Sequence, residues 1–109
     1  MIKLAVAGFP ISHSLSPLLH STAYKILGVE ADFSSVEIIE DKFGDYYFEA
    51  KKSGYRGLAL TMPLKEISIG FVDRVDPIAK QISSVNTIIF ESTGSIGLST
   101  DLLAFKNLL

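Results

Sequence analysis

Hydroxyl-bearing side chains are concentrated in one short loop near the start of the chain. The loop covers residues 8–15, and Ser14 and Ser16 are separated by one residue. In an extended segment this spacing places both side chains on the same side. Two neighbouring hydroxyls can hold a small polar ligand such as a carboxylate. The alternative is that Ser16 is only a helix cap and Ser14 is an ordinary loop residue.

A second candidate for chemistry is Lys65, which ends a short segment beginning at Thr61, directly after an expected strand. A lysine at this point carries a long side chain near the ligand-binding edge of a sheet. It can donate a proton to a carbonyl oxygen that gains negative charge. The alternative is a solvated surface lysine beside Glu66.

Two further polar residues flank the last expected strands. Asn86 stands at the start of one strand, where its amide group can both donate and accept hydrogen bonds. Asp101 opens the last expected helix, which it can cap. Alternatively, Asp101 faces Lys65 across a crevice, holds its ammonium group in place and shares a substrate hydroxyl.

Alternating strands and helices are expected to position these residues. Apolar runs, helical spacing and cap-then-proline signals predict strands over 2–7, 32–39, 56–60, 85–91 and 95–99, and helices over 16–27, 41–53, 64–72, 76–82 and 100–109. The pattern predicts an α/β domain of three layers. Its twisted sheet is mostly parallel with at least one antiparallel strand, and helices cover both faces. Because such sheets bind ligands beyond the carboxyl ends of their strands, we expect the site in the loops after strands 2–7, 57–60, 85–90 and 95–99.

Composition excludes several classes of partner. The net charge of -2 comes from 10 basic and 12 acidic residues that are scattered, so we expect no nucleic acid and no anionic membrane as partner. Residues 4–24 carry no charge, but prolines and serines interrupt them too often for a membrane span. The chain has no cysteine, and His13 and His20 have no carboxylate at ligand spacing, so we expect no metal site. Cytoplasmic localisation is the expectation.

Taken in order, the motifs of this chain resemble the shikimate and quinate dehydrogenase family. They read G-x-P-x-x-H-S-x-S-P-x-x-H from Gly8, G-x-x-x-T-x-P-x-K-E from Gly57, V-N-T from Val85 and G-x-x-T-D from Gly97. The match spans nearly the whole chain with the spacing of the family. The resemblance is to the N-terminal substrate-binding and catalytic domain.

The resemblance implies an oxidoreductase that reduces 3-dehydroshikimate to shikimate in chorismate biosynthesis, with NADP(H) as the hydride source. By resemblance, Lys65 and Asp101 form the catalytic pair, with the lysine as proton donor. The implied substrate-binding residues are Ser14, Ser16, Thr61, Lys65, Asn86 and Asp101. Shikimate and quinate as substrates, and NAD and NADP as cofactors, are alternatives that the sequence leaves open.

The chain departs from the family pattern in two ways. Ala59, Ser99 and Ser21 stand where the family usually has asparagine, and Ala59 removes a polar amide from the pocket. None of the eight glycines forms G-x-G-x-x-G. We therefore expect residues 1–109 to form one substrate-binding domain that binds no cofactor alone, is inactive alone, and needs a cofactor domain that is absent here or is a separate chain. The alternatives are a non-catalytic module that binds a hydroxy acid or a protein, and a homo-oligomer formed through an exposed interdomain face.

Overall fold

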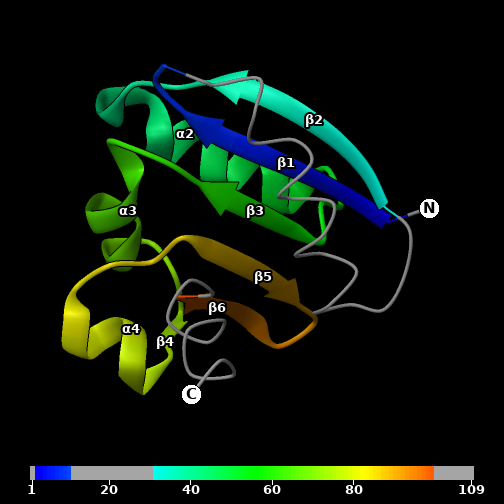
Figure 1. Cartoon of the computed structure of the whole chain (residues 1–109). Coiled ribbons are helices and arrows are strands. Elements are labelled where there is room, and N and C mark those ends of the chain that lie inside the picture. Colours follow the sequence, from blue (N-terminus) through cyan, green and yellow to red (C-terminus); the bar gives the residue numbers. More distant parts are fainter. Residues whose placement is uncertain (1, 11–30, 100–109) are drawn as a thin grey trace.

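A six-stranded mixed sheet forms the centre of the computed structural model, which describes residues 2–10 and 31–99 (Figure 1). The strands are β1 Ile2–Gly8, β2 Ala31–Glu37, β3 Gly57–Leu60, β4 Arg74–Val75, β5 Thr87–Glu91 and β6 Gly94–Leu98. Their order across the sheet is β2-β1-β3-β5-β6-β4. The sheet confirms the predicted α/β class.

Strand β5 runs against its neighbours. Strand β1 is parallel to β2 and β3, β5 is antiparallel to both β3 and β6, and β4 is parallel to β6. In Figure 1 the arrow of β5 accordingly points opposite to that of β3. The carboxyl ends of β1, β3 and β6 therefore lie beside the amino end of β5, along the side of the sheet where these strands end or begin. We call this side the site edge.

This orientation corrects one prediction about the site. The loop that follows strand β5 was expected to carry chemistry, but it lies at the opposite edge of the sheet because β5 is antiparallel to β3. The residues that reach the site edge are those that precede β5, and Asn86 is one of them.

Among the described residues, the helices follow their predictions except over residues 64–72. They are α2 Glu40–Lys52, α3 Leu64–Ile67, the short 3-10 helix η1 Ser68–Gly70 and α4 Pro77–Ile82. The single helix predicted over 64–72 is instead one turn of α-helix followed by a 3-10 turn. The hydroxyl of Ser68 donates to the carbonyl of Lys65 at 3.1 Å, and the amide of Phe71 donates to the carbonyl of Ser68 at 3.0 Å, which is the tighter 3-10 pattern.

Local signals placed two helices well. Asp76 caps α4 by accepting from the amide of Ile78 at 3.1 Å, and Pro77 takes the first helical position. In α2, acidic residues occupy the first turn and lysines the last turn, which favours the helix dipole. The helices predicted over 16–27 and 100–109 lie outside the described residues.

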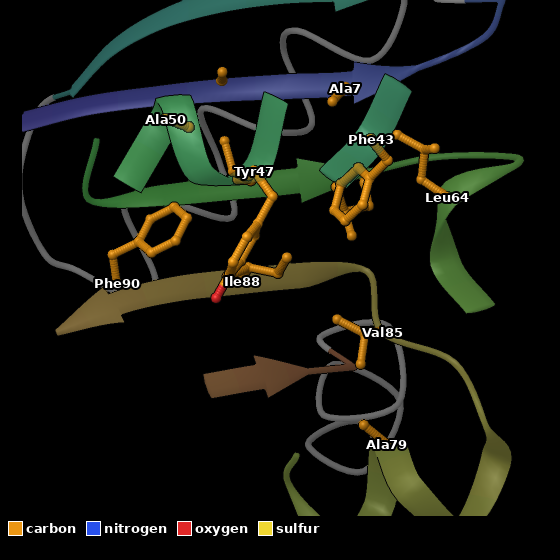
Figure 2. Close-up of a cluster of buried hydrophobic side chains, with 12 residues drawn as sticks. Ala7, Phe43, Tyr47, Ala50, Leu64, Ala79, Val85, Ile88 and Phe90 are labelled. Carbon is orange, nitrogen blue, oxygen red and sulfur yellow. The ribbon is translucent and has the colours of Figure 1, made fainter. Parts of the chain in front are cut away.

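The core lies between α2 and one face of the sheet. Phe43, Tyr47 and Ala50 recur at helical spacing and are buried against the sheet. Figure 2 shows this cluster, with the side chains of α2 directed at β3 and β5. The other buried residues of the same cluster come from the sheet, from α3 and α4 and from the segment before β5, and they are Ala5, Ala7, Leu58, Leu60, Leu64, Ala79, Val85, Ile88 and Phe90. This packing holds β1, β3 and β5 in place, and those strands lead to the site edge.

Candidate active site

The segment after β3 carries two of the predicted site residues. The amide of Thr61 donates to the carbonyl of Ala7 at the end of β1, at 3.0 Å. The carbonyl of Thr61 in turn accepts from the amide of Leu64 at 3.0 Å, which closes a turn into α3. Lys65 follows on this short helix and is half-buried. Main-chain bonds thus place Thr61 at the site edge and start the helix that carries Lys65.

Gly8 lets the loops after β1 and β3 approach each other closely. A side-chain carbon added at Gly8 would overlap the methyl group of Thr61 and lie 2.9 Å from the carbonyl oxygen of Met62. The next amide, that of Phe9, donates to the same Met62 carbonyl at 2.8 Å. The loop that carries Ser14 and Ser16 therefore leaves the sheet beside Thr61, although both serines lie outside the described residues.

Main-chain hydrogen bonds also bring Asn86 to this edge. Its carbonyl accepts from the amide of Leu60 at 2.7 Å, and its amide donates to the carbonyl of Leu98 at 3.0 Å. The preceding amide, of Val85, donates to the carbonyl of Lys65 at 2.9 Å. Main-chain bonds at or next to Thr61, Lys65 and Asn86 thus link three loops. These are the loop after β1, the loop after β3 and the segment before β5.

Thr87 is a neighbour of the site that the sequence prediction did not single out. Its hydroxyl donates to the side-chain oxygen of Asn86 at 3.0 Å, and both residues are half-buried. Across the strand pair, Thr87 is opposite Ala59, the position where the sequence departs from the family pattern. In the sequence, Thr87 stood only as the last residue of the V-N-T motif beside the Asn86 amide, and threonine is also a common strand residue.

The third strand end contributes Ser99, which directly follows β6 and is buried. Its neighbour Leu98 bonds to Asn86 through the main chain, so β6 ends beside β5 at the site edge. Asp101, the predicted partner of Lys65, lies two residues further on and outside the described residues. The structure thus brings together three of the six predicted residues, and it does not place Ser14, Ser16 or Asp101.

A separate side-chain network lies at the opposite edge. The hydroxyl groups of Tyr47 and Ser95 lie 2.5 Å apart, and both side chains are buried. Asp73 accepts from the amide of Ser95 at 2.7 Å and from its hydroxyl at 3.3 Å. The bond from the Ser95 amide, aided by Lys51, lowers the pKa of Asp73 below its ordinary value. Tyr47, Ser95 and Asp73 form what we call the hairpin anchor, because they tie the start of β6 to α2.

Two classes of feature are not found within residues 2–10 and 31–99. No group of three or more histidine or acidic side chains is arranged to hold a metal ion there. Over the same residues, no helix combines the length and apolar character needed to cross a membrane.

Fold and site together define a class: an α/β domain that presents small polar and cationic side chains at the carboxyl edge of a mixed sheet, an arrangement that can bind a small polar ligand. Within that class, residues 6–88 match the family model described as the shikimate dehydrogenase substrate binding domain. The chain belongs to this family.

Similar proteins and structures agree with this assignment. The chain is 38% identical over 96 residues to a shikimate dehydrogenase (NADP(+)) of Bacillus cytotoxicus, and 40% identical over 106 residues to one of Methanosarcina barkeri. These matches cover 88% and 95% of this chain. A shikimate 5-dehydrogenase of Thermus thermophilus, solved in complex with shikimate and also with NADP(H) and shikimate, superposes with a TM-score of 0.83 at 34% identity over 98% of this chain.

The chain spans a little over a third of the length of these relatives. The matched segments are 35% and 38% of the two curated proteins and 41% of the solved structure. The resemblance that the motifs indicated is thus confirmed at the level of the family and of its substrate-binding domain.

Proposed function

We propose that this chain is the substrate-binding and catalytic half of a shikimate dehydrogenase, which binds shikimate and 3-dehydroshikimate at the site edge. The observation that carries the proposal is the convergence of Thr61, Lys65 and Asn86 through main-chain bonds that join three loops. Hydroxyl, ammonium and amide groups are those that recognise a polyhydroxylated ring acid. Membership of the family supports the choice of ligand.

In the proposed mechanism, Lys65 donates the proton to the ring oxygen at which negative charge develops. Asp101 orients that ammonium group and shares a ring hydroxyl. Ser14 and Ser16 bind the carboxylate of the substrate, while Thr61 and Asn86 bind ring hydroxyls.

The reaction also requires a hydride, which NADP(H) supplies when bound. Residues 1–109 hold no glycine-rich dinucleotide motif, so they do not fit a cofactor site of that kind. We propose that a domain outside these residues, in the same polypeptide or in a separate chain, holds the cofactor over the site edge. The cytoplasm, where NADP-linked biosynthesis takes place, is the proposed location.

Isothermal titration of this chain with shikimate, without nucleotide, tests the proposal. We expect saturable binding that is lost when Ser14→Ala and Ser16→Ala are combined. The matched control combines Ser92→Ala and Thr93→Ala, which removes two hydroxyls from the turn at the opposite edge and should leave binding unchanged. A folded wild-type chain that shows no binding, or binding indifferent to both serines and to Lys65, would reject a pocket of this family.

A second candidate function is a non-catalytic module that binds the same class of hydroxy acid. Ala59 favours it, because this half-buried position beside Thr87 has no group that can recognise a ring hydroxyl. Supplying a cofactor domain in trans and following NADPH consumption with 3-dehydroshikimate separates the two functions. Turnover supports the enzyme, whereas binding without turnover under any pairing supports the module.

A further inference from the structure

We propose that Thr87 is a positioning residue that sets the orientation of the Asn86 amide toward the substrate. This inference rests on the proposed function, because it assigns a role within the same pocket. Thr87 acts through Asn86 and needs no contact of its own with the ligand.

The bond between the two side chains has a direction. The hydroxyl of Thr87 donates to Oδ1 of Asn86 at 3.0 Å. A carboxamide has an oxygen that accepts hydrogen bonds and an NH₂ group that donates them. Rotating the carboxamide by half a turn exchanges the positions of these two groups. A hydroxyl donor at Oδ1 selects one orientation, so the donating Nδ2 end is turned to the other side of the group. An amide held in this way recognises its ligand as a donor.

The main chain around both residues is fixed, so the side-chain bond is not a by-product of a loose loop. Asn86 is bonded through its amide to Leu98 and through its carbonyl to Leu60. Thr87 is in register with Leu98 on one side and Ala59 on the other. In addition, β-branching restricts the side-chain torsion of threonine. The donor and the acceptor are therefore both held in place before a ligand arrives.

Ala59 increases the importance of Thr87 in this chain. Residues in register on neighbouring strands lie on the same face with their side chains close together. Ala59 has no hydrogen-bonding group, so it can neither hold the Asn86 amide nor compete for the Thr87 hydroxyl. Of the two residues in register, 59 and 87, only Thr87 carries a group that bonds to the Asn86 amide.

Thr87→Val and Thr87→Ser test the proposal in shikimate titrations. Valine keeps the shape of threonine and removes the hydroxyl, whereas serine keeps the hydroxyl. We expect Thr87→Val to weaken binding roughly tenfold, and Thr87→Ser to bind within about twofold of wild type. In a double-mutant cycle, Thr87→Val should cause no further loss once Asn86→Ala is present. Thr93→Val, in the turn at the opposite edge, is the control and should bind as wild type does.

Nuclear magnetic resonance of the ligand-free protein tests the same proposal without binding. The ¹⁵N relaxation of the Asn86 side chain should report a rigid amide in the wild type and in Thr87→Ser, and a more mobile one in Thr87→Val. An equally rigid amide in Thr87→Val would overturn the inference, as would wild-type affinity for shikimate in that variant. A wild type that fails to bind shikimate would reject the proposed function instead, and the relaxation data would still decide the role of Thr87.

Discussion

Both edges of the sheet have main-chain hydrogen bonds, such as the one from the Arg56 amide to the Lys3 carbonyl at the opposite edge, but they differ in their buried side-chain bonds. At the site edge, main-chain bonds join the loops, as between Leu60 and Asn86 and between Val85 and Lys65. At the opposite edge, the hairpin anchor relies on side chains, with buried Tyr47 bonded to buried Ser95 and Ser95 bonded to Asp73.

This difference separates stability from chemistry. A buried side-chain hydroxyl must keep its partners, because an unsatisfied polar group is costly in the interior. A residue placed by its main chain keeps its position when its side chain is replaced. We therefore expect substitutions at the hairpin anchor to change folding, and most side-chain substitutions at the site edge to change function.

The largest effect is expected from Lys65→Met in the enzyme assembled with a cofactor domain. Methionine keeps the main-chain carbonyl that accepts from Val85 and removes the proposed proton donor. The turnover number with 3-dehydroshikimate should fall by about 10²- to 10⁴-fold, with little change in melting temperature. Lys80→Met, an exposed lysine of α4, is the control. A loss of turnover below tenfold would show that Lys65 is not the proton donor.

Gly8→Ala tests a site-edge residue that does not follow the expectation above. Its substitution must move the main chain. The added methyl group would overlap Thr61 and press on the Met62 carbonyl. We expect a loss of about 1–3 kcal/mol in the free energy of unfolding and a weaker affinity for shikimate, measured by denaturation and titration. In Gly70→Ala the new methyl group meets nothing within 4 Å, so both quantities should stay near wild type. Equal behaviour of the two variants would contradict the close packing of the loops.

Ser95→Ala should affect stability alone. It removes the hydroxyl that bonds to Tyr47 and Asp73, which we expect to cost about 1–3 kcal/mol in urea denaturation. Shikimate affinity of the folded protein should stay within about twofold. Ser53→Ala, an exposed hydroxyl at the end of α2, should change stability by less than about 0.5 kcal/mol. A Ser95→Ala variant as stable as wild type would remove the distinction between the two edges.

The smallest effect is the pH dependence contributed by Asp73. Because the folded pKa is lowered from 3.8, the unfolded state binds its proton first as the pH falls. The stabilisation by the charged carboxylate is therefore complete above pH values near 3.8 and is lost as the pH drops through the lower folded pKa. The stability difference between wild type and Asp73→Asn, measured by denaturation at stepwise lower pH, should shrink in that acidic window. A difference that stays constant there would show that the charge of Asp73 contributes nothing.

The sequence predicted those elements whose signals are local. The apolar run of β1, the helical spacing of α2 and the cap formed by Asp76 and Pro77 are all confirmed. Strand β4 was missed because two residues are too few to show alternation. The direction of β5 relative to β3 was not predicted either, because that pairing joins residues about 30 apart and depends on the packing of the whole sheet.

For the site, strand ends were the useful signal. Thr61 and Lys65 follow the end of an expected strand, as predicted, and Asn86 lies directly before β5, one residue outside the strand in which it was expected. Thr87 was not predicted as a site residue because its role depends on the geometry of a side-chain bond. The roles given to all six predicted residues stay predictions, and Ser14, Ser16 and Asp101 lie outside the described residues as well.

The reversed direction of β5 also determines where the chain can be lengthened. Strand β5 runs away from the site edge and β6 runs back to it. The turn that connects them, at Ser92 and Thr93, therefore lies at the opposite edge, where it is exposed. Exposed loop tips with small polar residues are the positions at which proteins best accept insertions. A fluorescent reporter or affinity tag inserted between these two residues would leave both strand ends that reach the site edge untouched.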